Sequence, residues 1–353
     1  MTDEPPESDF ATRLLNWWHS HGRHELPWQR NRTPYRVWIA EIMLQQTQVA
    51  TVIPYFERFM ATFPDLESLA QADIDDVLAH WSGLGYYARA RNLHLAARRC
   101  LAEHDGKLPN DPVALEALPG IGKSTANAIC AQAFDRRAPI LDGNVKRVLA
   151  RHAGIEGWPG RTAVLRRLWT EADARTPTGR ARDYTQAIMD LGATVCTPRG
   201  PDCQRCPIAH DCRARLEDRT EQLPTPKPRK TKPCRSTTIL IVENPRGQIL
   251  LQRRPPAGIW GGLWSPPEPG DMDTLPSGDE LDPPNAIRHQ FTHFILDIRF
   301  ERIRVDEDAF VADGENWCWM PPSRALEHGL PQPIRRAIEE LDRASTGNED
   351  AVS

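Results

Sequence analysis

Hydrophobic and polar positions follow two different periods along this chain of 353 residues. Over residues 8–195, apolar residues recur every three to four positions, a pattern that predicts amphipathic helices. Beyond a Pro-rich break, the period shortens toward two in 237–242, 249–252 and 291–300, which predicts strands. A closing helix is expected over 333–341. We therefore expect a mostly α first domain followed by a C-terminal α+β domain.

Composition predicts where the two domains meet. Residues 219–235 contain four prolines and carry a net charge of +5, which is typical of a stiff basic linker. We therefore place the first domain at 1–218 and the second at 236–343. Residues 344–353 are expected to be a disordered tail.

Charge is divided unevenly between the two parts. The formal net charge of −4 disfavours a nucleic-acid partner at first sight, but residues 1–235 sum to +5 and residues 236–353 to −9. The first part could therefore face phosphates. No apolar run approaches the roughly 20 residues of a membrane span, and residues 1–10 do not match a signal peptide. We expect a soluble, cytoplasmic monomer that does not bind membranes.

One carboxylate interrupts the most apolar helical stretch, residues 37–48. Glu41 lies one turn after Trp38 and directly before Ile42. Burial there would disfavour the charged form and raise the pKa of Glu41, as a general acid at neutral pH requires. For Glu41 taken alone, an ion-paired residue at the edge of a core is the plainer interpretation. The remaining motifs favour the acid.

Glycines mark two turns between helices. Gly120 and Gly122 precede a predicted helix start, where backbone N–H groups can bind an anion. Because no strand comes before them, a helix-hairpin-helix that binds a DNA phosphate fits better than a dinucleotide-binding turn. Residues 83–87 form a second Gly-bounded turn before an Arg-rich helix. Spacing does not decide whether that helix is a solvated basic face or tracks phosphates beside an intercalating loop.

A second carboxylate, Asp142, is a predicted N-cap. The helix dipole and capping N–H groups favour its ionised form, so we expect a depressed pKa for Asp142. A neutral Glu41 and an ionised Asp142 would match the division of roles between two carboxyls in glycoside hydrolysis.

Four of the eight cysteines lie within seventeen residues: Cys196, Cys203, Cys206 and Cys212. In a reducing compartment this cluster predicts a metal site rather than disulfides. Four thiolates bind either zinc or an iron–sulfur cluster. Zinc ribbons usually show two Cys-x-x-Cys pairs, whereas this sequence has one, and the spacing alone leaves the metal open.

Together these motifs resemble those of the MutY-type adenine DNA glycosylases, a helix-hairpin-helix iron–sulfur family. The resemblance covers residues 10–340. It rests on 26–28 (Leu-Pro-Trp), 41–48, 83–87, 118–122, 140–147, the cysteine spacing, 260–264 (Trp-Gly-Gly-Leu-Trp) and 291–293 (Phe-Thr-His). It implies a helix-hairpin-helix glycosylase domain with an iron–sulfur loop at 196–212, followed by a Nudix-like lesion-recognition domain.

The resemblance implies hydrolysis of the N-glycosidic bond of adenine paired with 8-oxoguanine or guanine in double-stranded DNA, after base flipping. Glu41 would protonate the adenine and later activate water, Asp142 would stabilise the oxocarbenium-like sugar, and Asn144 would lie near it. The other residues assigned in this way are Trp28, Leu44 and Gln186 in the adenine pocket; Gln46, Leu84, Tyr86, Gly120, Gly122, Lys123, Ser124 and Lys146 on DNA; Phe291, Thr292 and His293 on 8-oxoguanine, with Thr292 where the family more often has Ser; and Cys196, Cys203, Cys206 and Cys212 on one [4Fe–4S] cluster.

Three alternatives remain open at this stage. An endonuclease III-like pyrimidine glycosylase and lyase would need a nucleophilic Lys at the position of Ser124. Lys123 is one residue away and would point about 100° around the helix, so we expect a monofunctional enzyme, with Lys146 able to give weak lyase activity. A second alternative is a DNA-binding iron–sulfur protein without catalysis. A third, a nucleotide pyrophosphatase, is disfavoured because residues 236–353 lack the Nudix carboxylate signature.

Overall fold

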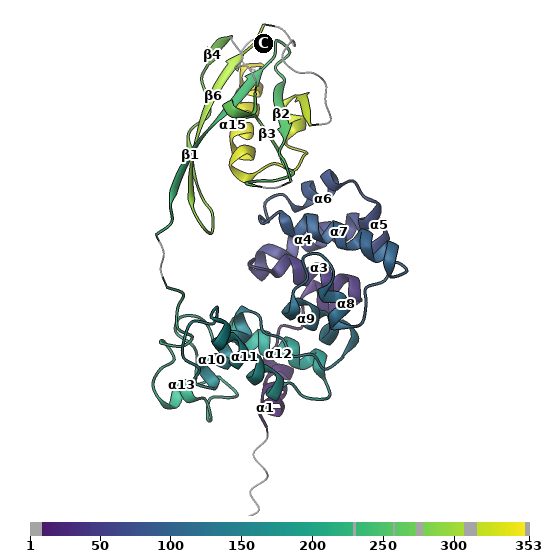
Figure 1. Ribbon diagram of the computed structural model, residues 1–353, viewed down its shortest axis with the longest axis vertical. Helices are drawn as coiled ribbons and strands as arrows, with labels where there is room; N and C mark the ends of the chain where they lie inside the picture. Colours follow the sequence, from purple (N-terminus) through teal and green to yellow (C-terminus); the bar gives the residue numbers. More distant parts are fainter. Residues whose placement is uncertain (1–8, 229–230, 257, 273–277, 307–315, 350–353) are drawn as a thin grey trace, which may run out of the picture. The chain divides into compact units, whose positions relative to one another are not determined.

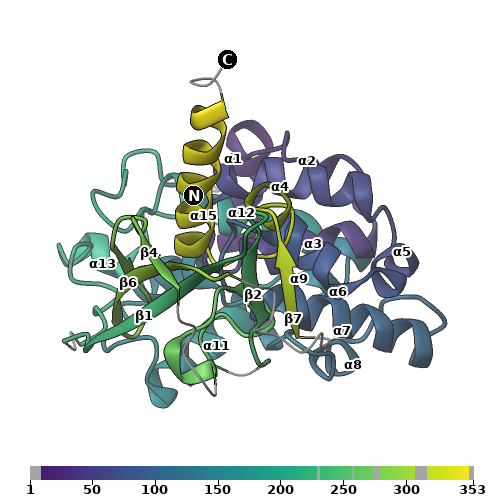
Figure 2. The same ribbon diagram turned by 90° about the horizontal axis from the view of Figure 1, so that it is seen from above.

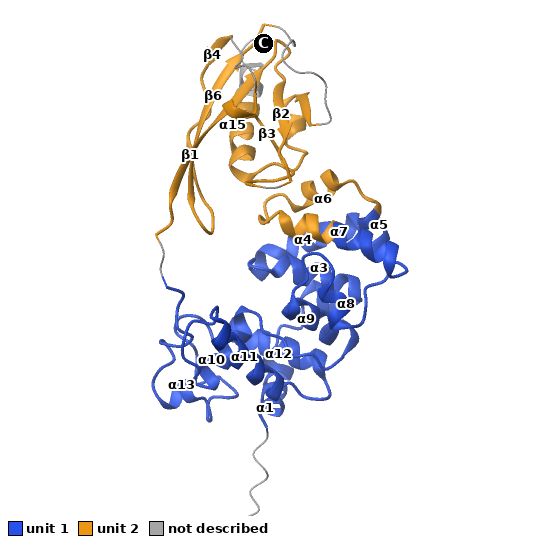
Figure 3. Cartoon of the chain, viewed as in Figure 1, with its two compact units in different colours: residues 1–70, 95–229 blue, residues 71–94, 230–353 orange. Residues whose placement is uncertain are grey.

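The computed structural model describes residues 9–228, 231–256, 258–272, 278–306 and 316–349. The chain forms two compact units (Figure 3), of which the first comprises residues 1–70 and 95–229 and the second residues 71–94 and 230–353. Within the described ranges, no helix is both long and apolar enough to cross a membrane.

The first unit is built from helices (Figure 1). They are α1 (Phe10–His21), α2 (Pro27–Arg30), α3 (Pro34–Leu44), α4 (Val49–Thr62), α5 (Leu66–Gln71), the second half of α7 (Ala88–Glu103), α8 (Pro112–Glu116), α9 (Lys123–Phe134), α10 (Gly143–His152), α11 (Thr162–Arg175), α12 (Ala181–Thr194) and α13 (Arg213–Leu216).

Helix α3 carries the predicted acid, Glu41, and most of its residues are buried. Thr33 caps it, accepting a hydrogen bond from the backbone N of Arg36 at 3.2 Å, and Pro34 occupies a favoured first position. The helix ends at Leu44, four residues before the end of the apolar stretch, so the prediction of a helix through residue 48 is wrong. The chain turns there because Gln46 adopts a left-handed backbone with φ 59°.

Helix α12 packs against both α9 and α10 and brings distant segments together. Gly192 on α12 lies so close to α10 that a Cβ atom there would be 2.6 Å from the Cβ of Asn144. A side chain at position 192 would therefore displace Asn144. Leu149, Ile188 and Leu191 fill the core beneath this contact.

A fully buried carboxylate on α12, Asp190, joins three segments. It accepts hydrogen bonds from the indole N–H of Trp18 at 2.9 Å, from the backbone N and Nε of Arg23 at 2.9 and 2.8 Å, and from Nε2 of Gln186 at 2.9 Å. The guanidinium of Arg23 also forms its ion pair with Asp190. A buried charge is tolerated when it is paired and hydrogen-bonded in this way.

In the part of the chain that the structure describes, the second unit contains a mixed seven-stranded sheet with helices. Its elements are α6 (Ile74–Trp81), the first half of α7, β1 (Cys234–Glu243), β2 (Ile249–Arg253), β3 (Trp264–Ser265), η1 (Pro269–Asp271), β4 (Asp279–Leu281), β5 (Ile287–Gln290), β6 (Ile295–Arg304), β7 (Trp317–Met320), α14 (Pro322–Ala325) and α15 (Gln332–Glu349). The order is β3-β2-β1-β6-β4, with β5 paired to β6 and β7 to β2; β1 and β6 are parallel and the other pairs are antiparallel.

Both faces of this sheet are covered by apolar side chains. Helix α15 lies against one face of the sheet (Figure 2). Ile239 and Phe300 belong to the same core cluster as Ile338 of this helix. Leu240 and Val242 belong to a smaller cluster on the other face. This alternation along β1 is the pleat that the period-two pattern predicts. A helical first unit and an α+β second unit confirm the predicted fold class.

Residues 71–94 belong to the second unit because polar contacts join them to it. Asp75 accepts from Nη2 of Arg253 at 2.5 Å and from the indole of Trp264 at 3.3 Å. The hydroxyl of Tyr87 donates to the carbonyl of Leu330 at 3.0 Å. The boundaries 1–218, 219–235 and 236–343 remain a prediction about domains, and packing groups the residues differently.

Three local expectations need correction. Strand β6 starts at Ile295 rather than at residue 291, since Phe291 and Phe294 close a hairpin turn through a 2.9 Å backbone hydrogen bond. Leu223, in the expected linker, is buried and accepts a hydrogen bond from Arg151. Residues 344–349, expected to be disordered, continue α15, and 350–353 lie outside the described residues.

Replacing Asp190 with Ala should remove about 3–5 kcal/mol from the free energy of unfolding, because buried donors lose their acceptor. The matched control is Asp183→Ala on the same helix, which breaks a partly exposed pair with Arg180 and should cost less than about 1 kcal/mol. Urea unfolding measures both values. Equal losses for the two variants would contradict the anchoring role of Asp190.

Candidate active site and cysteine cavity

An open cavity in the first unit brings most of the predicted site residues together. Its lining includes Glu41, Asp142, Asn144, Trp28, Leu44, Gln186, Gln46, Gly120, Gly122, Lys123 and Ser124. Lys146 lies on α10 outside this lining, whereas Leu84 and Tyr86 belong to the second unit. Segments separated by more than a hundred residues in sequence thus form one site.

Glu41 lies on the buried helix α3 and lines this cavity. Its Oε1 accepts a hydrogen bond of 2.6 Å from Nε2 of Gln132 on α9. Burial raises the pKa of Glu41 to about 7; the hydrogen bond from Gln132 opposes this rise, and the negative charge of Asp142 adds to it. The direction agrees with the sequence-based prediction, and the value is suited to proton transfer at neutral pH.

Asp142 is the N-cap of α10, as predicted. Its Oδ1 accepts from the backbone N of Val145 at 2.7 Å, and its Oδ2 accepts from Nδ2 of Asn144 at 3.2 Å. The prediction of a depressed pKa is nevertheless wrong. Burial raises the pKa of Asp142 and outweighs these hydrogen bonds and the nearby charge of Arg147, all of which lower it. The capping geometry was readable from the sequence, whereas the desolvation was not.

Arg147 fixes the side chain of Asn144 and connects the site to the cysteine loop. Its Nη2 donates to Oδ1 of Asn144 at 2.8 Å and to the carbonyl of Gly192 at 2.6 Å, and its Nε donates to the carbonyl of Cys196 at 2.7 Å. Because Asn144 also donates to Asp142, both ends of its amide are oriented.

The hairpin residues contact the cavity in different ways. Gly120 has a left-handed backbone with φ 78°, and α9 begins without a side-chain cap. The hydroxyl of Ser124 accepts a 3.0 Å hydrogen bond from the backbone N of Leu141, so it links the hairpin to the segment that carries Asp142. The ammonium of Lys123 lies 4.5 Å from the ring centroid of Trp169.

Sequence reasoning missed three lining or supporting residues: Arg23, Gln132 and Arg147. Gln132 left a readable signal, because it is one of few polar residues in the apolar run 126–134 and is buried. Arg23 left none, since its partner Asp190 lies far along the chain, and two of the three partners of Arg147 named above, Gly192 and Cys196, are equally distant.

All four clustered cysteines line a second cavity of the first unit. Buried Arg151 donates to the sulfur of Cys196 at 3.3 Å and to the carbonyl of Thr197 at 2.7 Å. Burial raises the pKa of Cys206 to about 12, so its free thiol is neutral near pH 7. Across the described ranges, no three His, Cys, Asp or Glu side chains converge closely enough to hold one metal ion.

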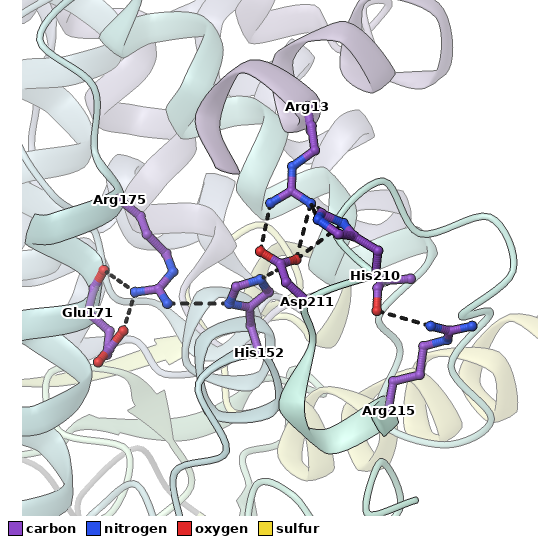
Figure 4. A network of polar contacts seen from close by, with 8 residues as sticks. Arg13, His152, Glu171, Arg175, His210, Asp211 and Arg215 are labelled. Carbon is purple, nitrogen blue, oxygen red and sulfur yellow. Dashed lines mark hydrogen bonds and ion pairs between the residues drawn. The ribbon is translucent and has the colours of Figure 1, made fainter. Parts of the chain in front are cut away.

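A polar network fastens the end of the cysteine loop to three helices (Figure 4). Asp211, next to Cys212, accepts from Arg13 of α1 at 2.8 Å and lies 3.1 Å from Nε2 of His152 on α10. Arg175 on α11 lies 3.3 Å from the other ring nitrogen of His152. The loop is therefore held at both ends, by this network and by Arg151.

In the second unit, the predicted lesion-contacting residues form a hairpin turn. Thr292 and His293 are exposed, while half-buried Phe291 stacks on Phe294 with 4.5 Å between ring centroids. The hydroxyl of Tyr86, a residue that is 47% exposed, lies 3.3 Å from Oγ1 of Thr292. Leu84 is buried instead, so its side chain does not project as a wedge here.

Two family models match the chain. Residues 39–173 match the HhH-GPD superfamily base excision DNA repair proteins, and residues 238–340 match the NUDIX domain. These matches correspond to the predicted helical and Nudix-like parts.

Individual proteins are similar over longer stretches. The adenine DNA glycosylase of Buchnera aphidicola subsp. Acyrthosiphon pisum is 35% identical over 343 residues, which are 95% of this chain and 98% of that protein. Human adenine DNA glycosylase is 37% identical over 311 residues, covering 73% of this chain and 57% of that protein. A solved thermostable thymine-DNA glycosylase is 28% identical with a TM-score of 0.54, over 59% of this chain and 95% of that chain.

Proposed function

The chain belongs to the adenine DNA glycosylases, enzymes of base excision DNA repair, and we propose that its substrate is adenine paired with 8-oxoguanine or guanine in double-stranded DNA. The observation that carries this proposal is the pair of carboxyls, Glu41 and Asp142, in one open cavity. The raised pKa of Glu41, about 7, supports a role as general acid.

The cavity suits a flipped nucleotide. Gly120, Gly122 and Lys123 line the same cavity as the two carboxyls, so a DNA phosphate at the uncapped start of α9 would hold the neighbouring nucleotide beside them. Trp28, Leu44 and Gln186 would then surround an adenine rotated out of the base stack. Such DNA is intracellular, so we propose that the enzyme acts in the cytoplasm. We also propose that it acts as a monomer.

The chemistry divides between the carboxyls. Neutral Glu41 donates its proton to N7 of adenine, the bond between C1′ and N9 breaks, and its electron pair leaves with the base. Ionised Asp142, held beside Asn144, stabilises the positive charge that develops on the sugar. Ionised Glu41 then takes a proton from the water that attacks C1′. Adenine and an abasic site are the products.

We propose a monofunctional enzyme rather than a lyase. Amine attack on the sugar needs a lysine at the site, and position 124 holds a serine whose hydroxyl accepts a hydrogen bond from the backbone N of Leu141. Lys123 lies over Trp169. With Ser124 and Lys123 held in these contacts, water rather than an amine is the proposed nucleophile.

Phe291, Thr292 and His293 are proposed to recognise 8-oxoguanine. Their support is the exposed turn and the proximity of Thr292 to Tyr86, which would enter the duplex beside the lesion. A nucleotide pyrophosphatase activity of this unit is disfavoured because residues 236–353 lack the Nudix carboxylate signature.

The four cysteines fit one [4Fe–4S] cluster. Four thiols that line one cavity are a complete ligand set for such a cluster, and a single Cys-x-x-Cys pair is less typical of a zinc ribbon. The guanidinium of Arg151, which donates to the sulfur of Cys196, would offset part of the negative charge of a bound cluster. Adenine hydrolysis transfers no electrons, so the bound cluster would supply structural support to the loop.

A base-release assay on A:8-oxoguanine, A:G and oxidised-pyrimidine duplexes tests the substrate. We expect adenine release from the first two and a rate that falls as pH rises through about 7, because Glu41 loses its proton. Glu41→Gln should reduce the single-turnover rate by about 100-fold or more, whereas Glu57→Gln at an exposed position of α4 should not. Pyrimidine release, or equal rates for Glu41→Gln and wild type, would contradict the proposal.

Thr292→Val keeps the shape of the side chain but removes its hydroxyl. We expect the ratio of the A:8-oxoguanine rate to the A:G rate to fall by roughly 5- to 10-fold, the effect of one lost hydrogen bond. Thr238→Val in β1 is the control. An unchanged ratio would argue against recognition by this turn.

Metal analysis of the purified protein tests the cluster. About four irons per chain are expected for one such cluster, and Cys203→Ser should lose iron together with DNA affinity. Bound zinc, or a colourless Cys203→Ser protein with full activity, would count against it.

A further inference from the structure

A buried amide contacts the proposed acid from a neighbouring helix. Gln132 belongs to the last turn of α9, is only 2% exposed and donates from Nε2 to Oε1 of Glu41 at 2.6 Å. It stands in a largely apolar run, where a polar side chain is retained at a cost unless it makes such a bond. No part of the chemistry described above uses this residue.

The donor itself is held in place. The guanidinium Nε of Arg182 on α12 donates to the backbone carbonyl of Gln132 at 2.9 Å, and the backbone N of Arg182 donates to Oδ1 of Asp135 at 2.8 Å. These bonds tie the end of α9 to α12. The amide therefore meets Glu41 from a fixed direction.

An N–H donor at Oε1 limits where Glu41 can carry its proton. In the neutral acid one oxygen bears hydrogen and the other is a carbonyl that only accepts. The amide N–H of Gln132 makes Oε1 the acceptor. A carbonyl oxygen accepts more strongly than a hydroxyl oxygen, so this bond favours the transferable proton on Oε2.

This inference rests on the proposed function. We propose that Gln132 is a positioning residue: it makes Oε2 of Glu41 the oxygen that gives up a proton to the base and later takes one from water. The bond persists in both states of Glu41, because Oε1 accepts as a carbonyl and as a carboxylate. One donor thus serves the acid step and the base step.

The hydrogen bond from Gln132 should have a measurable effect on the pKa of Glu41. Arg23, Lys123, Asp142 and Arg147 are the charged groups that line its cavity. Of these, Asp142 raises the pKa of Glu41, while the hydrogen bond from Gln132 lowers it. Loss of the amide should therefore raise the pKa of Glu41 and extend activity to higher pH.

The test is the pH profile of the single-turnover rate for Gln132→Met, which keeps the volume and removes the donor. We expect the alkaline limb to move up by about one pH unit, the effect of losing a hydrogen bond to a charged group, and the maximal rate to fall by roughly 10-fold. The matched control is Asn127→Leu on the same helix, whose buried amide donates to the carbonyl of Pro139 at 2.6 Å. It should leave the limb in place.

An alkaline limb that stays in place in Gln132→Met, or moves equally in both variants, would overturn the proposal. If Gln132→Met fails to fold, an NMR titration of the wild-type protein still tests the proposal. In wild-type protein without DNA, the side-chain amide ¹⁵N resonance of Gln132 should titrate with a midpoint near the pKa of Glu41, about 7, and stay constant in Glu41→Gln. Absence of titration in wild type would also overturn it. Neither NMR result depends on adenine release. Failure of the proposed function would appear in the base-release assay instead, so the two failures can be distinguished.

Discussion

Desolvation of one carboxyl, Glu41 on helix α3, is the constraint on which the site depends. The helix is packed on most sides, so the ionised form of Glu41 loses water that the protein replaces with one amide donor, Gln132. That exchange leaves the pKa of Glu41 close to neutrality. A carboxyl in this condition can give and take a proton at the same pH, which hydrolysis through an oxocarbenium-like sugar requires.

The scaffold around the cavity satisfies other buried charges in the same way. Asp190 binds donors from Trp18, Arg23 and Gln186, and Arg147 joins Asn144 to the carbonyl of Cys196. Asp190 on α12 thus binds α1 and the segment after it, and Arg147 on α10 binds α12 and the cysteine loop, so these segments are held in one relative position. The cysteine loop thereby supports α10, whose first residues carry Asp142 and Asn144. This connection would give the proposed cluster a structural role, since adenine hydrolysis transfers no electrons.

Local sequence was enough for features that depend on neighbours along the chain. The caps at Thr33 and Asp142, the hairpin glycines and the cysteine group were all readable, because their partners lie within a few residues. Features that depend on partners far along the chain could not be predicted from local sequence. The pKa of Asp142 rises because of burial by other segments, and Arg147 bonds to residues some 45 positions away. The turn at Phe291 was read as strand because a period-two pattern does not show where a hairpin closes.

The order in which the two carboxyls ionise is the central claim. Asp142 has two N–H donors and a nearby guanidinium that favour its charge, while Glu41 has one donor and feels the charge of Asp142. Carboxyl ¹³C NMR titration of protein labelled at Asp and Glu, assigned with Asp142→Asn and Glu41→Gln, measures both groups directly. We predict that Asp142 ionises first and that Glu41 follows with a midpoint near 7. Ionisation of both groups below about pH 5, near ordinary carboxyl values, in a protein that still releases adenine would contradict it.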